Sequence, residues 1–154
     1  MIFLLGCWVD EMGKTCGFLG NATLLNDTEI AAKLPPILID LIQNKGVDTF
    51  YVGVKGKFDT LAHKAVAHLK KEYPSIQIML VIAYHKDLER CVYPYDDFYF
   101  PLLCETGYKR WGIVRRNEWV IEESDYIVAC NQYHGKAYDF CQKAIHKGKV
   151  VIEV

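Results

Sequence analysis

The sequence predicts an α/β protein with three layers: a mostly parallel, five-stranded sheet with helices on both faces. Two observations predict this fold class. Short apolar segments alternate along the chain with longer segments of helical periodicity, which is typical of a parallel sheet joined by right-handed crossovers. Residues 76–82 form an apolar run continuous enough to be covered on both faces, as central parallel strands are.

The expected strands are residues 14–19, 49–52, 76–82, 126–130 and 149–154, and the expected helices are residues 29–45, a stretch from Phe58 to before Pro74, residues 110–124 and residues 136–146. Asp27 or Thr28 is suited to cap the first helix, and Gly46 to end it. Pro35 and Pro36 predict a kink in this helix or its division into two pieces.

The segment between the third strand and residue 109 is the least regular part of the chain. Its aromatic-rich middle contains Pro94 and Pro101, so it is not expected to form a central strand. By analogy with Rossmann-like domains we expect the strand order 3-2-1-4-5. Ligands bind such sheets outside the carboxyl ends of the strands, which is where we look for a site.

Composition limits the class of protein and of partner. The 154 residues are 51% hydrophobic and 24% charged, which fits one globular domain at residues 13–154. The formal net charge of −1 argues against nucleic acid as a partner. Residues 1–12 are a possible N-terminal extension, or an edge strand. The apolar run at residues 2–5 is too short to span a membrane, so no membrane partner is expected.

Cysteine and histidine spacing predicts neither a disulfide framework nor a metal site. The six cysteines contain no CxxC pair, and a chain of this size is expected to keep them reduced in the cytoplasm. His63 and His68 are five residues apart, which places them on different faces of a helix. We expect no metal and no cofactor.

Glycine-bearing turns follow three expected strands, at Gly20, between Gly53 and Gly56, and at Gly135. Glycine lets backbone N–H groups approach a ligand, and each following helix offers the positive end of its dipole. Together these turns are suited to cradle a phosphate. The alternative is that each glycine only makes a tight turn. Neither GxGxxG nor GxxxxGK[ST] occurs, so no standard dinucleotide loop or P-loop is predicted.

Three polar residues near these turns are candidates for ligand contact. Asp59 falls in the first turn of its helix, where it either improves the helix end or accepts ribose hydroxyls or orients an arginine. Arg116 and Asn117 share the inward side of their helix, and buried polar groups need partners. Either they bond loop carbonyl groups, or Arg116 reaches a ligand phosphate while Asn117 fixes the loops.

Two further features have a structural and a functional interpretation. Asp139, four residues after Gly135, is either an exposed helix carboxylate or a general acid or base. The aromatic residues of the irregular segment either stack on a base, cover the site, or form an oligomer contact, which we favour because apolar patches mark interfaces. These aromatic residues are Tyr93, Tyr95, Phe98, Tyr99 and Phe100.

The segments KTCGFLG, GVDTFYVGVKGKFDTLA, Tyr95 to Glu105, RRNEWVIEESDYIVAC and HGKAYDFCQKAIHKGKVV resemble the SLOG superfamily, and within it the small bacterial Rossmann-like proteins of the DUF1273/YpsA-like group. The resemblance covers nearly all of the chain after residue 12. It implies a Rossmann-like fold that binds a nucleotide or nucleotide-derived ligand, often as a dimer. The superfamily also contains the LOG-type phosphoribohydrolases, which cleave the base from a nucleoside 5′-monophosphate.

The chain departs from the LOG-type motifs at several positions. The arginine–lysine pair is Arg116–Asn117 here, the PGGxGTxxE motif falls on His134, Gly135 and Asp139, and the glycine–histidine–arginine after the first strand is Gly20–Asn21–Ala22. These changes favour ligand binding over hydrolysis. The predicted ligand-binding residues are Gly20, Asn21, Gly53, Gly56, Phe58, Asp59, Arg116, Asn117, Gly135 and Lys136; catalytic residues are not assigned.

Three functions are compatible with these residues. The leading hypothesis is a cytoplasmic nucleotide-binding sensor or regulatory module that forms a homo-oligomer, with a dimer favoured. The second is an enzyme that hydrolyses the N-glycosidic bond of a nucleoside 5′-monophosphate. The third is a structural or interaction protein with a decayed pocket.

Overall fold

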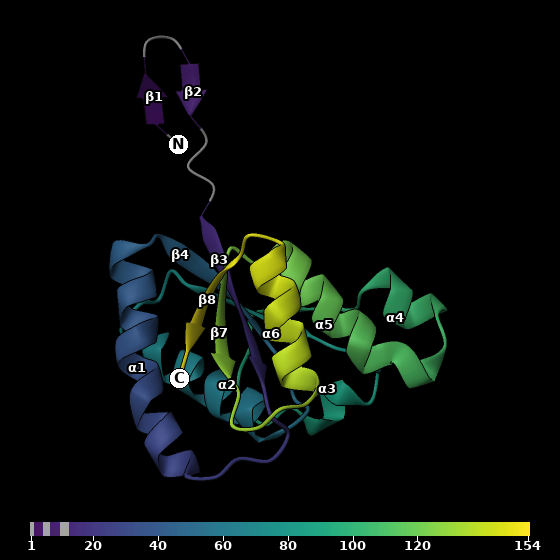
Figure 1. The fold of residues 1–154 in the computed structure, drawn as a ribbon. Helices are drawn as coiled ribbons and strands as arrows, with labels where there is room; N and C mark the ends of the chain where they lie inside the picture. The colour runs from purple at the N-terminus through teal and green to yellow at the C-terminus, as the bar shows by residue number, and fades with distance from the viewer. Residues whose placement is uncertain (1, 5–6, 10–12) are drawn as a thin grey trace.

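The structure, a computed structural model, describes residues 2–4, 7–9 and 13–154 (Figure 1). Its main element is a six-stranded sheet in which every neighbouring pair is parallel, in the order β6-β5-β4-β3-β7-β8. The strands are β3 (Lys14–Gly20), β4 (Val47–Val52), β5 (Gln77–Val81), β6 (Asp97–Tyr99), β7 (Tyr126–Cys130) and β8 (Val150–Glu153). The predicted α/β class and parallel sheet are confirmed, and the five predicted strands have the expected order.

The predicted number of strands is wrong, because β6 adds a sixth strand at the edge beside β5. It is only three residues long, and all three are exposed. The prolines that exclude a central strand do not exclude a short edge strand between them, since an edge strand pairs on one side only.

The helices that connect these strands are α1 (Asp27–Asn44), α2 (Lys57–Leu69), α3 (Asp87–Arg90), α4 (Leu102–Thr106), the 3-10 turn η1 (Lys109–Trp111), α5 (Gly112–Glu123) and α6 (Lys136–His146). The predicted strand over residues 126–130 and the predicted helix over residues 136–146 match β7 and α6 to the residue. The first helix differs from the prediction in two respects.

Helix α1 is one continuous element of 18 residues with both prolines inside it, not two pieces. Ile30, Leu34 and Leu38 are all buried in the same core, so the helix packs on this core on both sides of the prolines. The helix also lacks a side-chain cap: Asn26, in the left-handed conformation, precedes it, and the backbone carbonyl oxygen of Asn26 accepts the first bonds.

Side chains of successive strand residues enter two different hydrophobic clusters, as the alternation of a strand requires. In β3, Cys16 and Phe18 pack with the buried residues of α1 and α2, whereas Leu19 packs with Val120 of α5 and Cys141 of α6. The strands β4, β5 and β7 follow the same pattern. This alternation leaves the carboxyl ends of the central strands between α2, α5 and α6.

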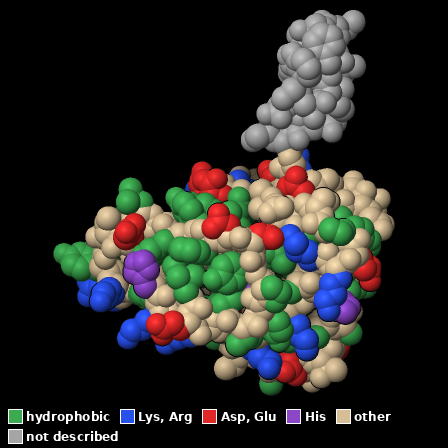
Figure 2. Space-filling view, turned by 180° about the vertical axis from the view of Figure 1, so that it is seen from behind, with side chains coloured by type: hydrophobic (Ala, Val, Ile, Leu, Met, Phe, Trp, Pro, Cys, Tyr) green, Lys and Arg blue, Asp and Glu red, His purple; other side chains and the backbone are tan. Residues whose placement is uncertain are grey.

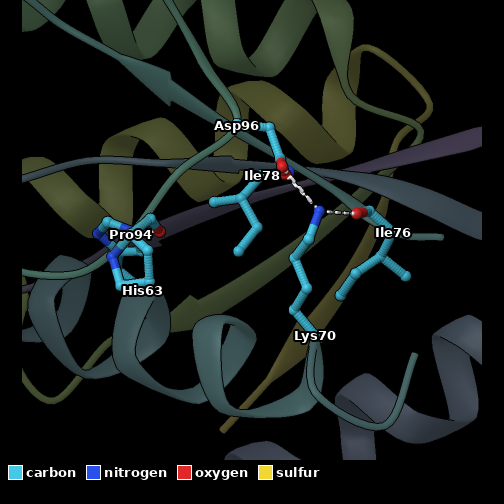
Figure 3. A network of polar contacts seen from close by, with 6 residues as sticks. All are labelled: His63, Lys70, Ile76, Ile78, Pro94 and Asp96. Carbon is cyan, nitrogen blue, oxygen red and sulfur yellow. Dashed lines mark hydrogen bonds and ion pairs between the residues drawn. The ribbon is translucent and has the colours of Figure 1, made fainter. Parts of the chain in front are cut away.

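A polar network fastens the edge strand to the rest of the domain (Figure 3). Lys70 Nζ, just after α2, donates to the Ile76 carbonyl oxygen and to the Asp96 carboxylate, each at 2.7 Å. Asp96 also accepts the Ile78 N–H at 2.7 Å. The ring Nε2 of His63 lies 2.8 Å from the Pro94 carbonyl oxygen. The segment that leads into β6 is therefore held by His63 of α2 and by Lys70, which directly follows this helix.

Strands β1 (Ile2–Leu4) and β2 (Cys7–Val9) pair antiparallel in a small sheet of their own and do not join the six-stranded sheet. The expected N-terminal extension includes residues 1, 5–6 and 10–12, which lie outside the described residues. Among the described helices, none is both long and apolar enough to cross a membrane.

Candidate functional site

A cavity of about 580 Å³ opens at the carboxyl ends of the central strands. Its walls come from the ends of β3 and β5, the loops after β3, β4 and β7, and the helices α2, α5 and α6. Four cationic side chains and two carboxylates line it, beside an apolar wall. The charged lining residues are Lys55, Asp59, Asp87, Arg110, Arg116 and Lys136, and the apolar wall includes Leu19, Val54, Val81, Ile113 and Phe140.

Arg116 lies at the base of this cavity and is only 5% exposed. Its Nε donates to the Val81 carbonyl oxygen at 3.0 Å, and its Nη1 donates to Asn117 Oδ1 at 3.0 Å. Its Nη2 has no hydrogen-bond partner among the described residues. Burial lowers the Arg116 pKa, and the negative charges of Asp59 and Asp87 oppose that change. A buried guanidinium with one free N–H edge is suited to bind an oxyanion.

The carbonyl bond expected for Arg116 is present, to Val81; contact with a ligand phosphate stays a prediction, for which Nη2 is the available donor nitrogen. Asn117 differs from the expectation, because its side chain fixes Arg116 and not the loops. Ile113, on the same helix, is 42% exposed and lines the cavity as well.

Asp59 lies beside Arg116, across Gly53. A Cβ atom on Gly53 would lie 2.6 Å from Arg116 Nη2 and 3.1 Å from Asp59 Oδ2, so both charged groups occupy the space that this glycine leaves open. Asp59 is in the first turn of α2, as predicted. Burial raises the pKa of Asp59 to about 6, although the charge of Arg116 lowers it. This carboxyl group thus titrates near neutral pH.

Asn21 helps to join the two loops that flank the cavity. It is buried, and its Oδ1 accepts the Gln132 N–H at 2.7 Å. The Gln132 side chain in turn accepts from the Leu25 N–H and donates to the Leu25 carbonyl oxygen, each at 2.6 Å. Asn21 lines the cavity, but its Oδ1 is bonded to the Gln132 N–H and holds the loop after β7.

The structure requires glycine at some of the predicted positions and not at others. A Cβ on Gly20 would come within 2.6 Å of three Phe58 atoms, and Gly56 has φ +90° with Ala22 Cα 2.9 Å from a Cβ position. Both need glycine for packing or conformation. Gly135 has an extended φ of −175° and no Cβ contact closer than 3.7 Å. The local fold therefore does not require glycine at position 135.

Seven of the ten predicted residues line the cavity: Gly20, Asn21, Gly56, Asp59, Arg116, Asn117 and Lys136. Gly53, Phe58 and Gly135 do not line it. Phe58 is fully buried in the core beneath Gly20, so its predicted ligand contact is a packing contact. Asp139 is exposed and lies outside the cavity lining.

Sequence reasoning missed Lys55, Asp87, Arg110 and Tyr133, which also line the cavity. Asp87 is the most informative of them, because it is 1% exposed. Its Oδ2 accepts the N–H groups of Ala83 and Tyr84 at 2.9 and 3.0 Å. The one available signal was an acidic residue soon after the carboxyl end of an apolar strand.

The aromatic segment around β6 lies away from this cavity and is largely exposed. None of Tyr93, Tyr95, Phe98, Tyr99 and Phe100 lines the cavity. Phe98 is 44% exposed and Tyr99 is 41% exposed, and the following Leu102 and Leu103 are exposed as well. Figure 2 shows hydrophobic side chains gathered on the face opposite the viewer of Figure 1. Stacking of these aromatic residues on a ligand in the cavity is therefore not supported.

Within residues 13–154, the cysteine and histidine side chains form no metal site. Cys16, Cys91, Cys104, Cys130 and Cys141 are all free thiols, and burial raises the pKa of the Cys91 and Cys104 thiols, among others. The residues that the structure describes contain no group of three or more potential metal ligands. Buried thiols with raised pKa values behave as small apolar side chains.

No protein-family model matches the chain, and no curated protein sequence matches it significantly.

Proposed function

We propose that this protein binds a nucleotide or nucleotide-derived ligand at the carboxyl ends of the strands, with a phosphate group at Arg116. The observation that carries the proposal is the free Nη2 of a guanidinium that is 5% exposed and lies in the cavity. Leaving a buried charged donor without a partner costs free energy, and a bound oxyanion supplies the missing acceptor.

Three further features support an anionic ligand with an apolar part. The N-terminal turns of α2 and α6 contribute Asp59 and Lys136 to the cavity lining, and the N-terminal end of a helix favours a negative charge. Cationic side chains outnumber carboxylates in the lining. The wall formed by Leu19, Val54 and Phe140 gives a flat base or another apolar group a surface to pack on.

The resemblance to the SLOG superfamily fits this proposal, since its members are expected to bind nucleotide-derived ligands on a Rossmann-like sheet. We accordingly propose a sensor or regulatory module, located in the cytoplasm, as the protein's role. The exposed segment from Phe98 to Leu103 is the proposed contact of a homodimer, and mass measurement of the wild type and of Phe98→Asp in solution tests it.

A second candidate function, hydrolysis of the N-glycosidic bond of a nucleoside 5′-monophosphate, is favoured by one observation. Asp59 lies in the cavity with a pKa raised to about 6 by burial, and a carboxyl group that titrates near neutral pH is suited to acid–base catalysis. Asp59 replaces Asp139 in this role, because Asp139 is exposed and does not line the cavity.

The test is a thermal-shift screen against nucleoside mono-, di- and triphosphates, ADP-ribose, NAD and ribose 5-phosphate. A ligand at a hundred times its dissociation constant stabilises the fold by ~2.7 kcal/mol. For a hit with the wild type, we expect a clearly smaller shift in Arg116→Ala and an unchanged shift in Arg115→Ala, the exposed neighbour. Loss of a bond to a charged donor predicts affinity weaker by about 10- to 100-fold. Equal shifts in all three proteins would contradict the proposal.

Chromatography of each hit separates the two candidate functions. Free base released by the wild type but not by Asp59→Asn supports hydrolysis, whereas binding without released base supports the sensor.

A further inference from the structure

Two buried polar atoms of opposite chemistry line the same cavity without a hydrogen-bond partner among the described residues. One is the donor Nη2 of Arg116, and the other is the acceptor Oδ1 of Asp87. Asp87 is even more deeply buried than Arg116, at 1% exposed. The nearest cation to Oδ1 is Lys55 Nζ, at 3.5 Å, in an ion pair without a hydrogen bond.

The backbone contacts of the two side chains place them close together. Arg116 Nε is bonded to the Val81 carbonyl oxygen, and Asp87 Oδ2 accepts the Ala83 N–H. Both charged groups are thus anchored to one three-residue segment at the end of β5. Asp87 contributes to the electrostatic field that opposes the lowering of the Arg116 pKa, which agrees with this proximity. A ligand that satisfies both free atoms has an acceptor and a donor a short distance apart.

We propose that Asp87 is a specificity-determining residue, which selects ligands that carry a hydroxyl donor beside the anionic group held by Arg116, as a sugar phosphate does. This inference rests on the proposed function and deepens it. A carboxylate oxygen accepts a hydrogen bond from a sugar hydroxyl group but repels a second anionic group. An unsatisfied buried acceptor therefore penalises a phosphate-bearing ligand that lacks the donor.

A sugar hydroxyl group fits the positions of the two free atoms better than a donor on the base of a nucleotide does. The two free atoms are fixed by residues 81 and 83 of one strand end, so the ligand's donor lies near its anion. Ring hydroxyl groups of a sugar phosphate lie close to the phosphate, whereas the amino group of a base lies at the far end of a nucleotide. Asp59 is the second carboxylate in the cavity, and the Asp59→Asn variant shows which of the two carboxylates binds the hydroxyl group.

The test compares ribose 5-phosphate with tetrahydrofurfuryl phosphate, which has a similar ring and no ring hydroxyl groups, by titration calorimetry. The wild type is expected to bind ribose 5-phosphate at least about tenfold more tightly. In Asp87→Asn the amide oxygen retains the Ala83 and Tyr84 bonds, and the amide nitrogen replaces the free acceptor by a donor. We expect this variant to bind the two compounds within about threefold of each other.

Three further variants complete the experiment. Glu72→Gln, an exposed carboxylate after α2, and Asp59→Asn are expected to keep the wild-type preference. Lys55→Met, which leaves the Asp87 carboxylate in place, is also expected to keep it, so that loss of the preference in this variant counts against Asp87 even if Asp87→Asn fails to fold. Thermal unfolding of each protein checks the fold.

The outcomes distinguish the two levels of the proposal. A wild type that binds both compounds equally, an Asp87→Asn variant with the full preference, or loss of the preference in Lys55→Met or Asp59→Asn overturns the role of Asp87 and leaves phosphate binding intact. A wild type that binds neither compound, or Arg116→Ala with unchanged affinity for both, overturns the proposed function itself.

Discussion

Arg116 Nε donates a hydrogen bond of 3.0 Å to the carbonyl oxygen of Val81, which joins helix α5 to the end of strand β5. This bond sets the orientation of the guanidinium plane. Asn117 Oδ1 occupies a second edge at 3.0 Å, and the third nitrogen remains free for the cavity. The planar fork of arginine makes this division possible, since it offers donors in several fixed directions.

Arg116→Lys tests whether this fork, and not the charge alone, is needed. Lysine has one ammonium group, which cannot reach both the Val81 carbonyl oxygen and the ligand position in the same geometry. We expect affinity for ribose 5-phosphate to fall by about tenfold or more, measured by titration calorimetry. Arg115→Lys, at the exposed neighbouring position, serves as the control. Full affinity in Arg116→Lys would show that a point charge suffices.

Gly53→Ala tests the close packing of Arg116 and Asp59. The new Cβ would lie 2.6 Å from Arg116 Nη2, so the guanidinium must move out of its position. We expect weaker binding of ribose 5-phosphate, and a loss of about 1–3 kcal/mol in the free energy of unfolding from overpacking.

Gly135→Ala is the matched control for this variant. Its extended φ of −175° and nearest Cβ contact of 3.7 Å accommodate alanine. Its free energy of unfolding is expected to equal the wild-type value or exceed it by up to about 1 kcal/mol. Urea unfolding measures both proteins, and equal destabilisation of the two would contradict the assigned crowding at Gly53.

Asp59→Asn is expected to stabilise the protein at pH 7. The folded-state pKa of Asp59 is raised to about 6, above its ordinary value of 3.8, so the folded protein binds the proton more tightly than the unfolded chain. The stability of the wild type therefore falls as pH rises through the window between these values. At about 1.4 kcal/mol per pKa unit, the gain at pH 7 has an upper bound of ~3 kcal/mol, because solvent reaches the carboxylate through the cavity.

Urea unfolding of wild type and Asp59→Asn measures this effect at several pH values between about 4 and 7.5, a range that includes the raised pKa of Asp59. The difference between the two proteins should grow with pH. A difference that does not change across this range would show that Asp59 titrates normally.

The fold was predictable where local pattern and tertiary packing agree. Strand β7 and helix α6 have uninterrupted periodicity between clear boundaries, and their predicted limits match the structure. Strand β6 has no such pattern: its three residues are exposed, and its position depends on pairing with β5 and on the Lys70–Asp96 contact. Both are interactions between segments distant in sequence, which periodicity cannot indicate.

The candidate site was predictable to the same extent. Arg116 was identifiable because it is a charged residue on the buried stripe of a regular helix. Asp87 and Lys55 were not, because Lys55 lies in the loop after β4 and Asp87 begins α3, a helix of only four residues that is too short to show a helical period in the sequence. In the turn after β5, Asp87 accepts hydrogen bonds from the N–H groups of Ala83 and Tyr84, and these contacts have no signal in the sequence pattern.

The contact between Lys70 and Asp96 provides the last prediction. Burial raises the pKa of Asp96. The hydrogen bonds from Lys70 and the Ile78 N–H, together with the charge of Lys70, lower this pKa by more than burial raises it, so that the net change is downward. The folded-state pKa thus lies below the ordinary value of 3.8. The stabilisation from this contact is complete above that value and is lost as pH falls through the folded-state pKa.

Lys70→Met removes the three bonds of the ammonium group to Ile76 and Asp96 while keeping the apolar part of the side chain. We expect the attachment of β6 to weaken by ~1 kcal/mol, equivalent to about a fivefold loss of amide protection. Hydrogen exchange of the Asp96 and Ile82 amides, which donate to Ile78 and Tyr99 across the β5–β6 pair at 2.9 Å, measures it. Lys71→Met, at the exposed neighbouring position, should exchange like the wild type. Unchanged protection in Lys70→Met would mean that strand pairing alone holds the edge strand in place.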